Sequence, residues 1–84
     1  MNTQTKKNTQ EIQEWIISWL SKELKIEADE LDIEEPFVNF NLSSRQTIIL
    51  TGDLEDWLGF SIEPSVAWEY PTINKLAEFL AAKN

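Results

Sequence analysis

Residues 43–59 read Ser-Ser-Arg-Gln-Thr-Ile-Ile-Leu-Thr-Gly-Asp-Leu-Glu-Asp-Trp-Leu-Gly. The first four residues have the Ser-x-x-Gln form of a helix capping box, which predicts Ser43 as the N-cap and Ser44 as the first helical residue. Gly59 is a typical helix end. With about 100° between successive residues, one face of this helix holds Thr47, Leu50, Leu54, Trp57 and Leu58. Ile48 and Ile49 fall outside that face, and we interpret them as part of a patch that meets a partner.

Two other segments have helical periodicity. Asn8 and Glu11 form an Asn-x-x-Glu helix start, and the apolar residues that follow predict a helix from Thr9 to Leu24. Thr72 is expected to cap a last helix, whose apolar positions follow the i, i+3, i+4, i+7 pattern at Ile73, Leu76, Ala77 and Leu80. Residues 1–8 are predicted as a polar N-terminal tail and residues 9–84 as one domain.

The segments between these helices differ in length. Residues 25–41 lose periodicity, are rich in acids and contain Pro36, so they predict a long loop. Loops of this length are uncommon unless pinned to the core, and the expected pins are Leu31, Ile33, Phe37, Val38 and Phe40. A short helix is expected within residues 65–69, before Pro71. The chain therefore predicts an all-α fold with three main helices, one short helix and a long first loop.

Composition excludes several classes of function. The 84 residues contain no cysteine and no histidine, which removes disulfides, the usual zinc ligands and histidine-based catalysis, so we expect no metal site and no enzyme activity. No stretch has the composition of a membrane span or a secretory signal, so we expect a cytoplasmic protein without membrane contact. The net charge of -8 disfavours nucleic acid and favours partners with basic docking surfaces.

The segment Asn39-Phe-Asn-Leu-Ser-Ser-Arg45 places a hydroxyl on the first turn of a helix, directly after the long loop. There the hydroxyl is expected to face solvent, close to unpaired amides and to the positive end of the helix dipole. This position suits attachment of a phosphate ester. Ser43 is occupied as the cap, and Ser44 is therefore the candidate for modification.

Four stretches together resemble acyl carrier proteins of the polyketide-synthase type, over nearly the whole chain after Gln10. They are Pro36-Phe-x-x-Phe-Asn-Leu-Ser-Ser44, Leu54-Glu-Asp-Trp-Leu-Gly59, Tyr70-Pro-Thr-Ile73 and Leu76-Ala-x-x-Leu80. The resemblance implies an acyl-carrier-like four-helix bundle with 4'-phosphopantetheine attached covalently to Ser44. It also implies that a phosphopantetheinyl transferase adds this arm, and that the thiol of the arm then holds an acyl group as a thioester in polyketide or lipid-type biosynthesis.

The attachment motif departs from the family pattern Gly-x-Asp-Ser-Leu. Asn41 stands at the glycine, Ser43 at the aspartate and Arg45 at the leucine, and Ile49 occupies a position where an acid is common. Serine retains the cap oxygen of aspartate, although it lacks the carboxylate. The departures at Arg45 and Ile49 favour particular partner enzymes.

The resemblance also suggests which residues meet the enzymes that load and process the acyl group. Acidic side chains would speed the encounter with basic surfaces, and Ile48 is the best apolar anchor. The predicted partner-binding residues are Arg45, Ile48, Ile49, Asp53, Glu55, Asp56, Glu63 and Glu69. Trp68 is expected to fill the core rather than to lie beside the arm.

Two alternatives stay open. A peptidyl carrier protein of nonribosomal peptide synthesis shares the helices and the arm but usually has a second glycine before the serine, and Asn39-Phe-Asn-Leu42 has none. A helical interaction module without any modification would use the serines only as caps. The carrier reading predicts a monomer, and a chain that begins at methionine favours a discrete protein over a domain of a synthase.

Overall fold

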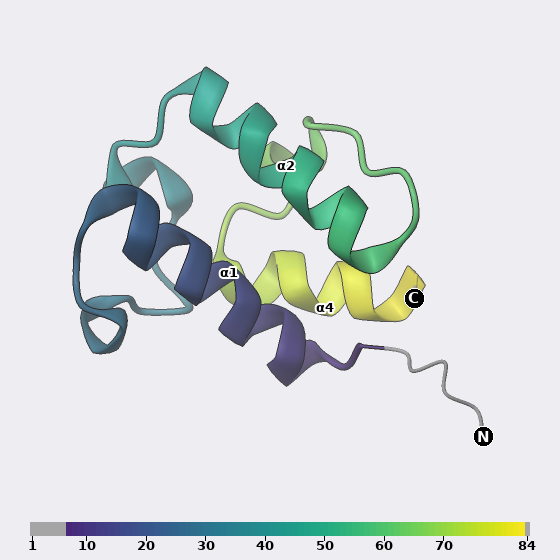
Figure 1. Cartoon of the computed structure of the whole chain (residues 1–84). Helices are drawn as coiled ribbons and strands as arrows, with labels where there is room; N and C mark the ends of the chain where they lie inside the picture. Colours follow the sequence, from purple (N-terminus) through teal and green to yellow (C-terminus); the bar gives the residue numbers. More distant parts are fainter. Residues whose placement is uncertain (1–6, 84) are drawn as a thin grey trace.

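The computed structural model describes residues 7–83, and within that range the chain is built from helices. The elements are α1 (Thr9–Leu24), two 3-10 turns (Ala28–Glu30 and Phe37–Phe40), α2 (Ser44–Leu58), α3 (Val66–Glu69) and α4 (Ile73–Lys83). The long loop after α1 lies at one end of the bundle and the connection from α2 to α3 at the other (Figure 1). The all-α prediction is confirmed, including the short third helix.

The helix ends follow from local chemistry. At the start of α1, the N–H of Glu11 donates to the Asn8 side chain at 2.8 Å, and the N–H of Asn8 donates to Glu11 Oε1 at 2.9 Å. α2 ends at Gly59, whose φ of 85° is easily reached without a Cβ. The polar tail predicted at residues 1–8 lies largely outside the described residues, but Asn8 is the α1 cap.

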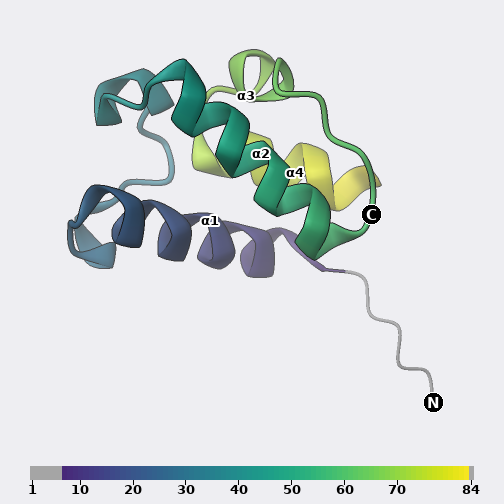
Figure 2. The same ribbon diagram turned by 45° about the horizontal axis from the view of Figure 1, so that its top comes forward.

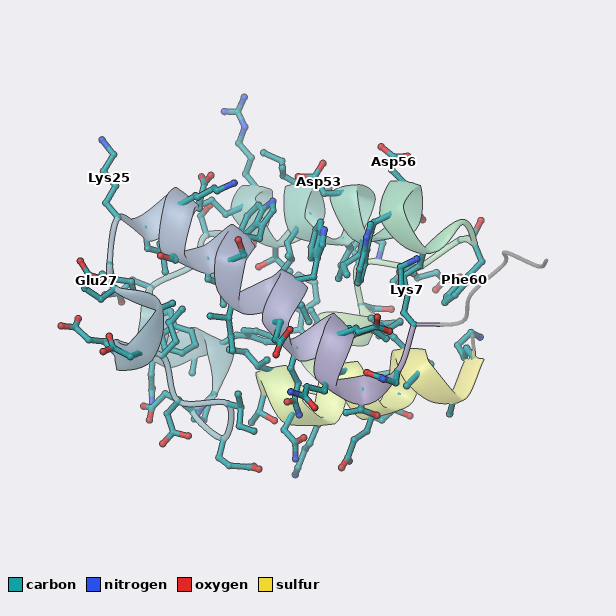
Figure 3. The ribbon with its side chains drawn as sticks, turned by 60° about the horizontal axis from the view of Figure 1, so that its bottom comes forward. Lys7, Lys25, Glu27, Asp53, Asp56 and Phe60 are labelled. Carbon is teal, nitrogen blue, oxygen red and sulfur yellow. The ribbon has the colours of Figure 1, made fainter. Side chains whose placement is uncertain are left out.

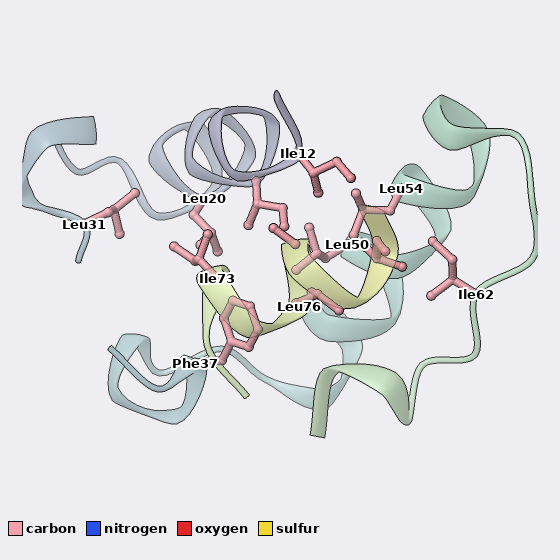
Figure 4. Packing of buried hydrophobic residues seen from close by; sticks show 12 residues of the cluster. Ile12, Leu20, Leu31, Phe37, Leu50, Leu54, Ile62, Ile73 and Leu76 are labelled. Atoms are coloured by element: carbon pink, nitrogen blue, oxygen red, sulfur yellow. The ribbon is translucent and has the colours of Figure 1, made fainter. Parts of the chain in front are cut away.

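The core lies between α1, α2 and α4, with α3 beside α2 (Figure 2). Each of the three long helices contributes side chains with no exposed surface, and Figure 4 shows many of them in one shared cluster. They are Ile12, Ile16, Leu20, Leu50, Leu54, Ile73, Leu76, Ala77 and Leu80. Burial of a leucine or isoleucine contributes about 1.5–3 kcal/mol, so this cluster is the main source of stability.

The long loop is attached by backbone hydrogen bonds to the connection between α3 and α4 and to the start of α4. The N–H of Phe37 donates to Pro71 O at 2.8 Å, and the N–H of Asn74 donates to Ile33 O at 2.9 Å. Four of the five predicted pins contact the core, with Leu31 and Phe37 buried and Ile33 and Phe40 partly buried. The prediction for Val38 is wrong. Its side chain is 71% exposed because it lies on the outer side of the turn whose inner side holds Phe37.

Aromatic side chains close the surface between α1 and α2. The rings of Trp15 and Trp57 stack with centroids 5.3 Å apart, and the Lys7 ammonium lies 5.1 Å from the centroid of the Trp57 ring. Such contacts add to the apolar burial of both rings. None of the described helices is long and apolar enough to cross a lipid bilayer.

Candidate functional site around Ser44

The start of α2 assigns different roles to two adjacent serines. The N–H of Gln46 donates to Ser43 Oγ at 3.1 Å, and the N–H of Ser43 donates to Gln46 Oε1 at 2.9 Å. Ser43 is therefore engaged as the cap, as the sequence predicted. Ser44 is the first residue of α2 and is exposed to solvent.

Asn41 turns the chain at the end of the long loop, two residues before the α2 cap Ser43. Its φ of 61° and ψ of 33° lie in the left-handed region, and its N–H donates to Val38 O at 3.2 Å. Glycine adopts this conformation without strain, and asparagine is among the few other residues that adopt it readily. Asparagine is thus compatible with this left-handed turn, at the position where the resemblance places a glycine.

An apolar groove begins at Ser44. It has a volume of about 100 Å³, and its lining comes from the long loop, α2 and the region of α3. The lining residues are Phe37, Val38, Leu42, Ser44, Thr47, Leu50, Ala67, Trp68 and Pro71. The reading of Trp68 as a core side chain is wrong. Trp68 is 55% exposed and forms one border of the groove, because four-residue α3 turns it toward Ser44 instead of toward α4.

Seven of the eight predicted partner-binding residues fall into three groups, and Glu55, which has an internal contact, stands apart from them. Arg45, Ile48 and Ile49 are exposed on the first two turns of α2, directly after Ser44. Asp53 and Asp56 follow along the outer edge of the same helix (Figure 3).

Two further acids lie beyond α2, with Glu63 in the connection that follows it and Glu69 at the end of α3. Both are exposed. They are therefore separate in sequence and in secondary structure from the patch next to Ser44.

Two of the predicted docking acids also have contacts within the chain. Glu55 is only partly exposed, and its Oε2 accepts the N–H of Ile62 at 2.7 Å, which fixes the chain after α2. The Asp53 carboxylate accepts the Trp19 indole N–H. Sequence reasoning missed both contacts, and it also missed the bond from Gln46 Nε2 to Glu23 Oε2 at 3.1 Å.

The position of Ser44 suits attachment of a phosphate group. Among residues 7–83, histidine, cysteine and carboxylate side chains do not gather into a group that could hold a metal ion. Ser44 offers an exposed hydroxyl on the first turn of a 15-residue helix, where backbone amides and the helix dipole favour a phosphate group. The site therefore fits a phosphate ester that carries a longer chain along the groove or away from it.

Comparison with known proteins agrees with this geometry. A family model described as phosphopantetheine attachment site matches residues 14–80. The chain is 36% identical over 72 residues to one component of the phenolphthiocerol/phthiocerol polyketide synthase of Mycobacterium tuberculosis, an alignment that covers 86% of this chain and 4% of the synthase component. It therefore spans a small part of the length of such synthases.

A relative of similar size is the acyl carrier protein TtuC of Teredinibacter turnerae, which is 30% identical over 74 residues, with 88% of this chain and 85% of TtuC covered. Among solved structures, an acyl carrier protein of Anabaena sp. PCC 7120 with a variant phosphopantetheinylation-site sequence has a TM-score of 0.86 at 37% identity, covering 99% of this chain and 94% of that one. A free-standing peptidyl carrier protein of Acinetobacter baumannii has a TM-score of 0.85 at 33% identity, with 90% and 95% covered. The chain belongs to the family of phosphopantetheine-binding carrier proteins, and within it to carriers of the polyketide-synthase type.

Proposed function

We propose that the chain is an acyl carrier protein that holds its 4'-phosphopantetheine on Ser44 and catalyses no reaction itself. The observation that carries the proposal is the division of roles at the start of α2, where both serines are exposed but the Ser43 hydroxyl accepts the Gln46 N–H as the cap. The variant site described for the Anabaena protein supports the view that departures from the usual motif are compatible with an acyl carrier.

The modification follows from ordinary phosphoryl chemistry. The Ser44 oxygen forms a bond to the phosphorus of the phosphopantetheine portion of coenzyme A, the phosphoanhydride bond breaks, and 3',5'-adenosine diphosphate leaves. The hydroxyl proton passes to a base on the transferase, because the chain has no histidine and no cysteine to accept it. The arm supplies the thiol on which an acyl group is held as a thioester.

The partners would be a phosphopantetheinyl transferase and the enzymes that load and process the acyl group in polyketide or lipid-type biosynthesis. These enzymes would meet Arg45, Ile48, Ile49, Asp53 and Asp56 on α2, with Glu63 and Glu69 at the margin. We give Glu55 a mainly internal role because it holds the Ile62 amide. The protein would act as a cytoplasmic monomer.

A peptidyl carrier is the second candidate, because a peptidyl carrier protein has nearly the same structural similarity to this chain as the acyl carrier protein. The polyketide synthase relatives favour an acyl cargo. The two functions separate in a loading experiment in which the modified chain is offered to acyltransferases with acyl-coenzyme A and to adenylation enzymes with amino acids and ATP. Loading by the first group alone is the expected result.

The attachment site is tested by intact mass spectrometry after incubation with coenzyme A, magnesium and a panel of phosphopantetheinyl transferases. The wild type and Ser43→Ala should each gain one phosphopantetheine, and Ser44→Ala should gain none. If the adduct is lost in Ser43→Ala and kept in Ser44→Ala, the attachment site is Ser43 and not Ser44. An unmodified wild type, beside a control carrier that is modified, would instead favour the interaction module without an arm.

A further inference from the structure

The side chain of Gln46 is hydrogen-bonded at both ends of its amide. Its Oε1 accepts the Ser43 N–H at 2.9 Å, and its Nε2 donates to Glu23 Oε2 in α1 at 3.1 Å. A rotation of the amide by half a turn would place its NH2 group against the Ser43 N–H and its oxygen against the Glu23 carboxylate, and both contacts would be repulsive. The bond to Glu23 therefore selects the amide orientation in which Gln46 completes the capping box of α2.

This bond links α1 to the peptide directly before Ser44. The Ser43 N–H is held by Gln46, and Gln46 in turn is held by Glu23, so the three residues form a chain of hydrogen bonds that we call the cap relay. The end of α1 and the start of α2 lie at the same end of the bundle, next to the long loop (Figure 2). The cap relay therefore ties the entry into Ser44 to a neighbouring helix.

The segment around Ser44 has little apolar anchoring of its own. Residues 38–46, all of which the structure describes, include no buried side chain, although Phe40 and Leu42 are partly buried. The nearest buried side chains on either side are Phe37 and Thr47. Packing thus holds this stretch mainly from its two ends, and a segment with few buried contacts depends more on its hydrogen bonds.

The stability of α1 does not explain the position of Glu23. Glu23 is the next-to-last residue of this helix, where a carboxylate meets the negative end of the helix dipole. The N-terminus of α2 is the end of a helix that favours a negative charge, and the exposed Glu23 carboxylate accepts its hydrogen bond from a residue of that terminus. Glu23 therefore contributes to α2 and not to its own helix.

We propose that Glu23 is a positioning residue for the modification of Ser44, which holds the Ser43 peptide through Gln46 and so sets the place of the Ser44 hydroxyl in the transferase. This inference rests on the proposed function, because the modification of Ser44 is the reaction concerned. Misplacement of a reacting group slows the chemical step more than it weakens binding, so loss of Glu23 should appear in kcat. Ser43→Ala leaves the cap relay intact, because it keeps the backbone N–H.

The first test removes the Glu23 carboxylate. In the transferase reaction Glu23→Ala should lower kcat about fivefold, with the KM for the carrier within about twofold of wild type. Its melting temperature should stay within about 3 °C of wild type, because loss of the bond to Gln46 is offset by removal of an unfavourable charge from the end of α1. Glu23→Gln keeps an acceptor oxygen and should recover most of the lost kcat. Glu27→Ala removes an exposed carboxylate just after α1 and should leave kcat unchanged.

An exchange of acid and amide tests the direction of the cap relay. Gln46→Glu keeps an oxygen for the Ser43 N–H and remains a capping-box residue, but it sets two carboxylates against each other, so kcat should fall about fivefold. The double variant Glu23→Gln/Gln46→Glu restores the hydrogen bond with donor and acceptor exchanged, and its kcat should return to within about twofold of wild type. Because Gln46→Glu retains the cap, its loss of kcat separates positioning from helix stability.

Amide exchange follows the cap relay in the unmodified chain. Hydrogen exchange measured by NMR should show the Ser43 amide about threefold less protected in Glu23→Ala than in wild type. Unchanged protection, wild-type kcat in both Glu23→Ala and Gln46→Glu, or an equal loss of kcat in Glu27→Ala would overturn the inference while the wild type is modified normally. A wild type that gains no adduct would instead overturn the proposed function, and this inference with it.

Discussion

The indole N–H of Trp19 in α1 donates a hydrogen bond to the Asp53 carboxylate in α2, with 2.7 Å between nitrogen and oxygen. Together with the bond between Gln46 and Glu23, it joins the two helices at their surface, outside the shared apolar core. An acid that the sequence suggested for partner docking thus also sets the position of the helix that carries Ser44.

Loss of the hydrogen bond between Trp19 and Asp53 should lower the free energy of unfolding slightly, and the effects of the two single substitutions should be coupled. Trp19→Phe keeps an aromatic ring but loses the donor, and Asp53→Ala removes the acceptor. Because both groups lie near the surface, we expect a coupling energy of about 1 kcal/mol in a double-mutant cycle measured by urea unfolding. A coupling energy near zero would show that the hydrogen bond contributes nothing to stability.

Ser43 should affect stability and not modification. Ser43→Ala removes the cap of α2 and is expected to lower the free energy of unfolding by about 1 kcal/mol. Ser43→Asp should restore most of the loss, because its carboxylate also accepts the Gln46 N–H. Thermal unfolding of the two variants beside Ser44→Ala provides the measurement. A larger loss in Ser44→Ala than in Ser43→Ala would contradict the assignment of the cap.

Asn41 should respond to backbone preference and not to side-chain chemistry. Its left-handed conformation predicts that Asn41→Gly changes stability little, whereas Asn41→Val costs about 1–2 kcal/mol because a β-branched residue is strained there. Denaturant midpoints for the two variants check this expectation. Equal stability of the glycine and valine variants would rule out the left-handed turn as the reason for asparagine.

Trp68 should be nearly dispensable for folding. Its side chain is 55% exposed, and Trp68→Ala should cost about 1 kcal/mol or less. Leu50, with no exposed surface, borders the same groove from the core side, and Leu50→Ala should cost about 3 kcal/mol. Similar losses of stability in the two variants would contradict the exposed position of Trp68 and support the sequence-based prediction that it fills the core.

Local patterns were sufficient to predict much of this fold. Each capping box, at Asn8 and at Ser43, depends on two residues three apart in sequence, and the start of α1 follows from the first of them. These features can therefore be predicted from a short stretch of sequence. The buried face of α2 follows from helical spacing in the same way, with Thr47, Leu50 and Leu54 buried. The acyl-carrier fold and the phosphopantetheine cofactor were predicted from the resemblance to a family, and that resemblance depends on the order of several motifs along the chain.

The errors arose where the direction of a side chain depends on long-range packing. Val38 and Phe37 are adjacent and both apolar, and only the docking of the turn against Pro71 decides which one is buried. Trp68 was misplaced because α3 is too short for periodicity to define a face. The internal roles of Asp53 and Glu55 depend on Trp19 and Ile62, which lie 34 and 7 residues away, and spacing within α2 carries no signal for either contact.

The two walls of the groove beside Ser44 differ in how the backbone is held, and this has a consequence for motion. The loop wall is tied to Pro71 and to the start of α4 through the amides of Phe37 and Asn74, so exchange of these two protons for deuterium requires the loop to separate from both. The opposite wall rests on a single four-residue helix. Widening of the groove should therefore be a movement of α3 away from a stationary loop, with α3 amides exchanging quickly while those of Phe37 and Asn74 stay protected.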